Sequence, residues 1–205
     1  MDKIKLEGIF KDFSVIGFEV LRKGDNNEEF FLFIDEKTDF ELFVENLKAS
    51  YNLPGIIFLN IKPCTLLEFH TQISKLIKPN FVLEIREDFV CSDALKELKK
   101  IKEIYNFRIA IDDFGKSFSN TQRFLILRPE FVKIDIKDFS ETEIANFVSF
   151  FKKARTIAIA EKVESLHEFL LIKKLGFDLW QGFFEKYLNT SVNFLHEKFN
   201  TKESS

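Results

Sequence analysis

The chain has 205 residues, a hydrophobic fraction of 45% and a charged fraction of 31%, values typical of one folded domain with a sizeable core. The net charge of −3 at pH 7 argues against a protein that binds DNA or RNA through a broad basic face. No apolar run is long enough to span a membrane, and residues 1–5 contain no secretory core, so we expect a cytoplasmic protein. We predict one domain over residues 1–200 and a disordered tail over residues 201–205.

Cysteine, histidine and lysine give no site of their own. Cys64 and Cys91 lie far apart without a CxxC pair, and the three histidines are scattered, so a zinc site is not expected. We interpret the two cysteines as buried thiols. A lysine-rich segment has the spacing of a solvated helix face; its lysines are Lys96, Lys99, Lys100 and Lys102.

Short apolar runs alternate with longer amphipathic segments along the chain. The runs are rich in Ile, Val and Phe and too short for helices; they span residues 15–18, 30–34, 56–59, 81–83, 109–111, 131–134, 157–160 and 177–180. Helical patterns lie between most of them, such as residues 93–101 and 166–175, the second closed by Gly176 at a C-cap position. Residues 54–55 and 78–80 read as turns before two of the strands.

Strand followed by helix, repeated about eight times, is typical of a doubly wound sheet or of a closed β/α barrel. Runs that are apolar on both faces and joined by helices indicate parallel strands covered on each side. No GxGxxG or P-loop motif follows the early strands, so the nucleotide-binding forms of the open sheet lose support. We therefore predict an α/β fold with a single domain, a modified TIM-type β/α barrel.

A polar residue or pair follows most of the apolar runs. These residues are Glu19, Asn60, Glu84, Asp112 with Asp113, Lys133 with Asp135, Glu161 and Gln181. In a β/α barrel the carboxyl ends of all strands meet at one rim, where the active sites of such enzymes lie. A single acid after a strand commonly caps the next helix, but helix capping does not explain the whole set.

So many carboxylates at close range repel one another unless a cation neutralises them. Oxygen ligands from Asp, Glu and Asn suit Mg²⁺ or Mn²⁺ rather than zinc. The vicinal pair Asp112 and Asp113 can bridge two ions, the arrangement that activates water against a phosphodiester. Lys133 on the same rim can steady the nucleophile or the developing charge. The pattern predicts hydrolysis of a phosphate ester assisted by one or two metal ions.

Seven motifs in a fixed order carry a family resemblance. They are Glu19-Val20-Leu21, Leu59-Asn60-Ile61-Lys62-Pro63, Leu83-Glu84-Ile85-Arg86-Glu87, Asp112-Asp113-Phe114-Gly115, Val132-Lys133-Ile134-Asp135, Ala160-Glu161-Lys162-Val163-Glu164 and Gln181-Gly182-Phe183. The sequence resembles the EAL domain, the family of cyclic di-GMP phosphodiesterases, over about residues 15–184. The resemblance implies a β/α barrel with one antiparallel strand.

The resemblance also implies a role for each matching residue. The implied metal ligands are Glu19, Asn60, Glu84, Asp112 and Asp113. The implied catalytic group comprises Lys133, which assists the attacking water, Glu161, Glu87, which braces the loop after Asp113, and Glu164. The implied substrate-binding group comprises Gln181, Arg22, Lys23 and Asp135. The implied reaction opens cyclic di-GMP to linear pGpG with Mg²⁺ or Mn²⁺, and the resemblance implies a homodimer.

The chain departs from the family pattern in four places. Lys23 stands where members carry an arginine, and it loses the bidentate fork. Lys116-Ser117 replaces Thr-Gly, and Lys162 replaces a glycine. The region from 23 to 55 is abbreviated, which looks more like the EAL half of EAL–HDOD proteins. Two hypotheses follow: an active phosphodiesterase, or a catalytically inactive EAL domain that acts as a cyclic di-GMP receptor or binds a protein partner.

Overall fold

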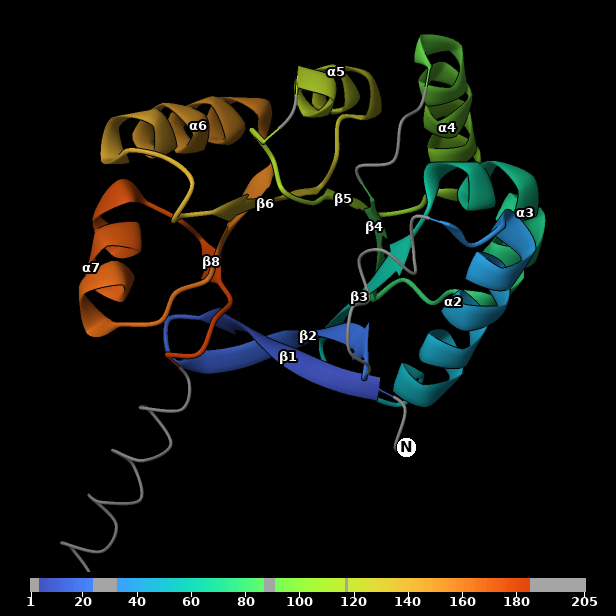
Figure 1. Ribbon diagram of the computed structural model, residues 1–205, viewed down its shortest axis with the longest axis horizontal. Helices are drawn as coiled ribbons and strands as arrows, with labels where there is room; N and C mark the ends of the chain where they lie inside the picture. The colour runs from blue at the N-terminus through green and yellow to red at the C-terminus, as the bar shows by residue number, and fades with distance from the viewer. Residues whose placement is uncertain (1–3, 24–32, 87–90, 117, 185–205) are drawn as a thin grey trace, which may run out of the picture.

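The computed structural model describes residues 4–23, 33–86, 91–116 and 118–184. Eight strands close into one barrel in chain order, and the helices lie around its outside (Figure 1). The strands are β1 (Ile4–Lys11), β2 (Ser14–Arg22), β3 (Ile56–Ile61), β4 (Phe81–Ile85), β5 (Ile109–Ile111), β6 (Phe131–Asp135), β7 (Ile157–Glu161) and β8 (Leu179–Trp180). The helices are α2 (Glu36–Ser50), α3 (Pro63–Leu76), α4 (Ser92–Tyr105), α5 (Phe118–Leu127), α6 (Glu141–Ala154) and α7 (Leu166–Leu175).

Strand β1 is the antiparallel member of the barrel. It forms a hairpin with β2 and closes the barrel against β8, whereas all the other neighbouring strands are parallel. The closure is narrow, because Phe10 opposite Trp180 is the pair that joins β1 to β8. The two rings stack with centroids 4.5 Å apart, and the Trp180 indole donates a hydrogen bond of 2.7 Å to the carbonyl of Asp12 in the hairpin turn.

The barrel interior is filled by one layer of buried apolar side chains. Its members are Ile9, Phe58, Val82, Ala110, Phe131, Ile159 and Leu179. Alternate residues of the same strands point outward and pack under the helices in two larger apolar clusters. Burial on both faces explains why the parallel strands read as nearly continuous apolar runs.

Capping motifs fix where the last two helices begin and end. Ser140 with Glu143 and Ser165 with Glu168 form capping boxes at the starts of α6 and α7, which satisfy backbone N–H groups that the helix itself leaves unpaired. Gly176 follows α7 with a φ of +85°. The prediction of a glycine C-cap is therefore confirmed, because glycine adopts this left-handed conformation without steric cost.

The predicted barrel is confirmed, and the errors concern its beginning. Seven of the eight predicted runs overlap a strand, but the run at residues 30–34 was wrong: Phe33 is helical and Ile34 lies outside any strand, while residues 30–32 are not described. Strand β1 was missed. Its Lys5 and Glu7 interrupt the apolar residues, because this strand carries charged groups on its inner side.

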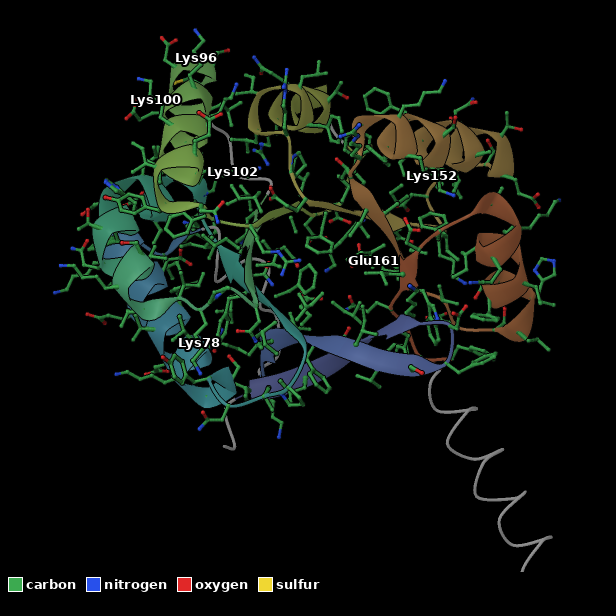
Figure 2. The ribbon with its side chains drawn as sticks, turned by 180° about the vertical axis from the view of Figure 1, so that it is seen from behind. Lys78, Lys96, Lys100, Lys102, Lys152 and Glu161 are labelled. Carbon is green, nitrogen blue, oxygen red and sulfur yellow. The ribbon has the colours of Figure 1, made fainter. Side chains whose placement is uncertain are left out.

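Two predictions about surface residues need correction. Cys64 and Cys91 are exposed, not buried. Lys96 and Lys100 point away from the barrel, as predicted (Figure 2), but the side chain of Lys102 is only 12% exposed and lies 2.8 Å from Glu130.

Within the described part of the chain, no helix has the length and apolar character needed to cross a membrane. The predicted tail at 201–205 lies outside the described residues.

Candidate metal centre

A ring of polar side chains lies one layer above the apolar interior. Residues two apart in a strand point to the same side of a sheet. The polar residue two positions after each inner apolar residue therefore also points into the barrel, nearer its mouth. The pairs are Phe58 and Asn60, Val82 and Glu84, Ala110 and Asp112, Phe131 and Lys133, Ile159 and Glu161, and Leu179 and Gln181. Glu19 of β2 and Glu7 of β1 hydrogen-bond to members of this set. These eight residues, Glu7, Glu19, Asn60, Glu84, Asp112, Lys133, Glu161 and Gln181, are called the polar ring below.

Lys133 lies among the carboxylates of the polar ring and is 1% exposed. Its Nζ atom lies 2.9 Å from Glu19 Oε2, 3.0 Å from Glu84 Oε1, 2.9 Å from Glu161 Oε1 and 3.7 Å from Asp112 Oδ1. Burial acts to lower the pKa of Lys133, but the carboxylates, Asp112 foremost, raise this pKa well above its usual value. One permanent positive charge therefore faces four acidic groups.

The acidic groups of the ring respond unequally to this crowding. Burial raises the pKa of Glu84 well above its usual value, and the nearby Glu19 raises it further. Burial is also the main reason that the pKa of Asp112 is raised and that the pKa of Glu161 reaches about 8. Burial acts in the same direction on Glu19, but Lys133 and neighbouring side-chain amides outweigh it and lower the pKa of Glu19. The ring thus carries more carboxylates than its own lysine neutralises.

Two side-chain amides hold Glu19 in place. Asn60 donates a hydrogen bond of 3.0 Å to Glu19 Oε1, and Gln181 donates one of 2.6 Å to Glu19 Oε2 and one of 3.0 Å to Glu7 Oε2. The next residue, Gly182, has a φ of +151°, and a Cβ added there would lie 2.3 Å from the carbonyl oxygen of Val163. Glycine is therefore required after Gln181 for the two loops to approach this closely.

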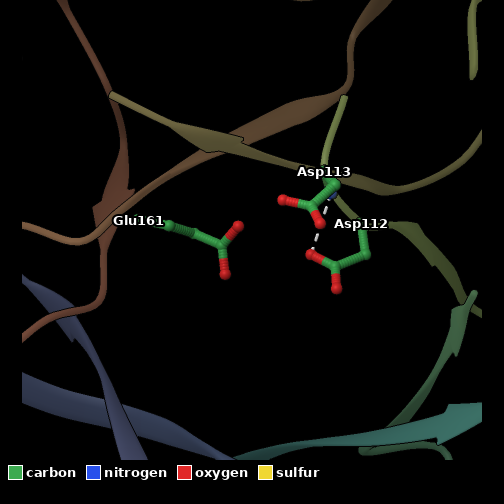
Figure 3. Close-up of side chains that lie close together, drawn as sticks. All are labelled: Asp112, Asp113 and Glu161. Atoms are coloured by element: carbon green, nitrogen blue, oxygen red, sulfur yellow. Dashed lines mark hydrogen bonds between the residues drawn. The ribbon is translucent and has the colours of Figure 1, made fainter. Parts of the chain in front are cut away.

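Three carboxylates at the mouth of the barrel lie close enough together to hold a cation. Oxygen atoms of Asp112, Asp113 and Glu161 all lie within 4.8 Å of one another (Figure 3). Asp113 has a φ of +47°, and its backbone N–H donates to Asp112 Oδ1 at 2.9 Å, which orients the vicinal pair. Below them, the buried Glu84 Oε2 accepts no hydrogen bond from the described residues. An all-oxygen set with excess negative charge fits Mg²⁺ or Mn²⁺.

Two lysines lie beside this acidic site. Lys116 Nζ lies 2.6 Å from Asp113 Oδ1, 3.1 Å from Asp138 Oδ2 and 3.7 Å from Asp135 Oδ2. Lys162 also forms an ion pair with Asp135, which is 1% exposed. Burial acts to lower the pKa of Lys116, but hydrogen bonds to Asp113 and Asp138 raise it. Asp135, predicted to bind substrate, is thus engaged with these lysines, and its predicted role stays a prediction.

A cavity of about 460 Å³ opens above the ring, a volume within the usual range for small-molecule sites. Besides ring residues, its walls include Lys5, Lys162, Glu164, Gly182 and Phe183. The predicted catalytic residue Glu164 therefore lies at the cavity, with its carboxylate 3.5 Å from Lys137.

The other predicted residues lie farther out or are not described. Arg22 lies at the end of β2, 3.3 Å from Glu45, and Lys23 is exposed just after that strand. Glu87 lies outside the described residues. The structure brings together the five predicted metal ligands with Lys133, Glu161 and Gln181. Substrate binding by Arg22 and Lys23 stays a prediction.

Glu7 is the member of the ring that sequence reasoning missed. It comes from β1, which was not recognised as a strand. The alternation of Leu6, Gly8 and Phe10 with Lys5, Glu7 and Ile9, followed by the turn at residues 12–13, contains the signal of a hairpin. Reading that alternation would have placed Glu7 on the same side as Ile9, and hence in the barrel.

The raised pKa values predict how the metal-free protein responds to pH. Glu161 has a folded-state pKa of about 8 against an ordinary value of 4.5, so the folded protein binds more protons than the unfolded chain between these values. Stability should therefore fall as pH rises from about 4.5 to about 8. Glu84 and Asp112 act with the same sign, whereas the lowered pKa of Glu19 favours the folded state above its usual range.

Melting temperatures measured with EDTA at pH 5, 6.5 and 8 test this prediction. Glu161→Gln should flatten the decline, because the variant has no proton to lose at that position. Glu103→Gln is the matched control, since Glu103 is exposed on α4 and pairs only loosely with Lys99 at 3.9 Å. A decline of equal slope in Glu161→Gln and in the unchanged protein would contradict the assignment.

Comparison with known proteins identifies the family. The sequence model of the EAL domain matches residues 38–186, which include every ring residue except Glu7 and Glu19. A probable cyclic di-GMP phosphodiesterase of Escherichia coli K12, PdeA, is 32% identical over an alignment of 143 residues that covers 61% of this chain and 20% of the relative. The chain therefore spans about a fifth of the length of this curated relative.

Solved structures support the same fold. BlrP1 of Klebsiella pneumoniae, in a manganese and cyclic di-GMP complex, is 22% identical with a TM-score of 0.77 and covers 88% of this chain and 54% of its own. YkuI of Bacillus subtilis, in complex with cyclic di-GMP and calcium, is 22% identical with a TM-score of 0.74 and covers 98% of this chain and 63% of its own. These structures share the β/α barrel, and the match to the family's sequence model covers most of this chain. The chain belongs to the EAL domain family.

Proposed function

We propose that this chain is a phosphodiesterase that hydrolyses cyclic di-GMP to linear pGpG with Mg²⁺ or Mn²⁺. The observation that carries the proposal is the excess of carboxylates around Lys133, with Asp112, Asp113 and Glu161 converging at the mouth below a cavity. The relatives support the choice of substrate, because BlrP1 holds cyclic di-GMP with manganese and YkuI holds it with calcium.

Asp112, Asp113 and Glu161 would hold the metal, with Glu84, Glu19 and Asn60 offering further oxygen atoms from the strands beneath. When bound, Mg²⁺ or Mn²⁺ supplies Lewis acidity, which makes water easier to deprotonate and offsets the negative charge of the phosphate. The donor set fits such an ion because it contains only oxygen, and because Lys133 alone leaves most of the negative charge of the ring uncompensated.

The protein's own groups position the reactants and move the proton. Lys133 is a buried, permanently charged donor that can hold the attacking water and stabilise the charge that develops on the phosphate. Gln181 is 4% exposed, and its Oε1 atom accepts no hydrogen bond from the described residues, so it can accept one from water or substrate. The water oxygen bonds to phosphorus, the bond from phosphorus to the ribose 3′ oxygen breaks, and that oxygen takes up the proton.

The rim of the cavity matches the charge of the substrate. Cyclic di-GMP carries two phosphates, and the cavity is lined by two lysines, Lys5 and Lys162, which pair with Glu7 and Asp135. Phe183 is 48% exposed beside Lys5 and offers a ring on which a guanine base can stack.

Incubation of the purified protein with cyclic di-GMP and Mn²⁺ or Mg²⁺, followed by chromatography, tests the proposal. We expect pGpG with either metal and none with EDTA. Asp112→Asn should lose at least ~100-fold in rate, whereas Asp93→Asn, which changes a 90% exposed carboxylate on α4, should retain the full rate. Full activity in Asp112→Asn would show that the site is assigned wrongly.

A second candidate function is a catalytically inactive receptor for cyclic di-GMP or a scaffold for a protein partner. The ion pair between Lys116 and Asp113 favours it, because this lysine competes for an oxygen that an active site would give to metal. Binding of cyclic di-GMP without any pGpG under both metals would support the receptor and reject the enzyme.

A further inference from the structure

Lys116 lies where the family places a threonine, in the loop between β5 and α5. Its ammonium lies 2.6 Å from Asp113 Oδ1, and Asp113 is one of the three carboxylates that converge at the mouth of the barrel (Figure 3). Any cation that binds Asp113 through this oxygen must either displace the lysine or share the oxygen with it. The lysine therefore acts directly on the metal site.

The surrounding structure holds Lys116 in this position. Asp138 lies 3.1 Å and Asp135, at the end of β6, 3.7 Å from the same ammonium, so three carboxylates hold it. The loop also turns back sharply: Gly115 has a φ of +100°, and a Cβ there would lie 2.6 Å from the ring of Phe139. The Lys116 backbone N–H then donates to the Asp113 carbonyl at 3.3 Å, which keeps the two residues together.

The two sides of the acidic site differ in charge because of this lysine. On the inner side, Asp112 and Glu161 share Lys133 with Glu19 and Glu84, so negative charge exceeds positive charge. On the outer side, Asp113 already has a cation of its own. Lys162 adds a second positive charge at Asp135, next to that pair. The inner side sets four carboxylates against one ammonium group, whereas the outer side sets Asp113, Asp135 and Asp138 against two. A divalent ion is therefore attracted less strongly to the outer side, where it also meets the ammonium of Lys116 directly at Asp113.

We propose that Lys116 takes the place of one metal ion at Asp113, so that the site loads one divalent ion readily and a second only weakly. This inference rests on the proposed function, because it takes the acidic site to be a metal site. It assigns to Lys116 the role of setting how many ions the centre holds. Lys116 acts through Asp113, so it is a positioning residue and not a catalytic one.

The proposal is tested by titrating the metal-free protein with Mn²⁺. Calorimetry and electron paramagnetic resonance of the free ion monitor the titration. The unchanged protein should bind one ion, with the second absent or weak. Lys116→Met removes the charge but keeps the length of the side chain, and it should bind the second ion with a Kd at least tenfold lower. Lys116→Arg keeps the charge and should behave like the unchanged protein.

Lys100→Met is the matched control. Lys100 pairs with Glu97 at 2.8 Å over the same spacing of three residues, but it lies on the outside of α4, away from the barrel mouth (Figure 2). Lys100→Met should bind the first and the second Mn²⁺ with the same affinities as the unchanged protein. If Lys116→Met gains no affinity for a second ion while the unchanged protein binds Mn²⁺, the inference is wrong and the metal site stands. If no variant binds Mn²⁺ at all, the proposed function is wrong as well.

Discussion

Lys133→Met is expected to lower the rate of cyclic di-GMP hydrolysis by at least ~100-fold while leaving a folded protein that still binds Mn²⁺. The buried ammonium contacts Glu19, Glu84 and Glu161 within 3.0 Å, and no other described lysine or arginine forms an ion pair with these three carboxylates. The variant therefore loses the donor proposed to act on the attacking water, and it leaves the acidic ring without an internal cation.

The same change should destabilise the metal-free protein. Removing one partner of a buried ion pair typically costs about 3–5 kcal/mol, and each 1 kcal/mol shifts the melting temperature of a chain of this size by roughly 2–4 °C. We expect a fall on the order of 10 °C at pH 8 with EDTA, and a smaller one at pH 5, where the raised pKa values of Glu84 and Glu161 keep these two groups protonated. Mn²⁺ should raise the melting temperature more in Lys133→Met than in the unchanged protein, because the ring then lacks one positive charge.

Lys102→Met provides the comparison. Lys102 is another largely buried lysine, 2.8 Å from Glu130, but it ties α4 to the segment after α5, outside the ring. Its loss should cost stability without changing the rate or the response to Mn²⁺. A Lys133→Met protein that hydrolyses cyclic di-GMP within a few-fold of the unchanged rate would exclude any role for this lysine in the reaction.

The sequence predicted most of the ring because of a simple property of strands. Once a strand such as residues 131–134 is placed, the period of two decides that Lys133 points the same way as Phe131. The convergence of strand ends then brings it near Glu84 and Glu161, from strands that are distant in sequence. The apolar runs alone carried this information, so Asn60, Asp112 and Gln181 could be placed without any knowledge of distances.

What could not be predicted depends on tertiary contacts. The inner position of Glu7 follows from the antiparallel pairing of β1 with β2 and β8, which a short strand interrupted by charges does not reveal. The partner of Lys116 depends on the turn at Gly115, which has a φ of +100° and lies close against the ring of Phe139. The exposure of Cys64 likewise depends on which face of α3 packs on the barrel. Local pattern does not fix any of these three.

Glu84→Gln is expected to have opposite effects on stability and on function. Glu84 is 0% exposed, and burial, together with Glu19, Asp112 and Glu161, raises its pKa. At neutral pH its ionised form therefore costs stability in the metal-free fold, and a neutral amide of the same shape removes that cost. Glutamine Oε1 can still accept the hydrogen bond that Lys133 donates to Glu84 Oε1 at 3.0 Å, so the ring should keep its packing.

We expect the melting temperature of metal-free Glu84→Gln to rise by several degrees at pH 8 and to change little at pH 5, where Glu84 is protonated in the unchanged protein. The rate of cyclic di-GMP hydrolysis should fall at least ~100-fold, and the stabilisation by Mn²⁺ should shrink, because an anionic ligand is lost. The ionised Glu84 that would favour metal binding thus lowers the stability of the metal-free fold. Such a trade-off between stability and activity is common at functional sites.

Glu130→Gln separates this effect from the general loss of a carboxylate. Glu130 is partly exposed, pairs with Lys102 and accepts a hydrogen bond from the Ile109 backbone N–H at 2.8 Å. Neutralising it should lower the melting temperature slightly and leave the rate unchanged, the reverse of the result at Glu84. Glu84→Gln could instead melt at a lower temperature than the unchanged protein at pH 8. In that case the charge of Glu84 stabilises the metal-free ring, and the prediction that it destabilises the ring is wrong.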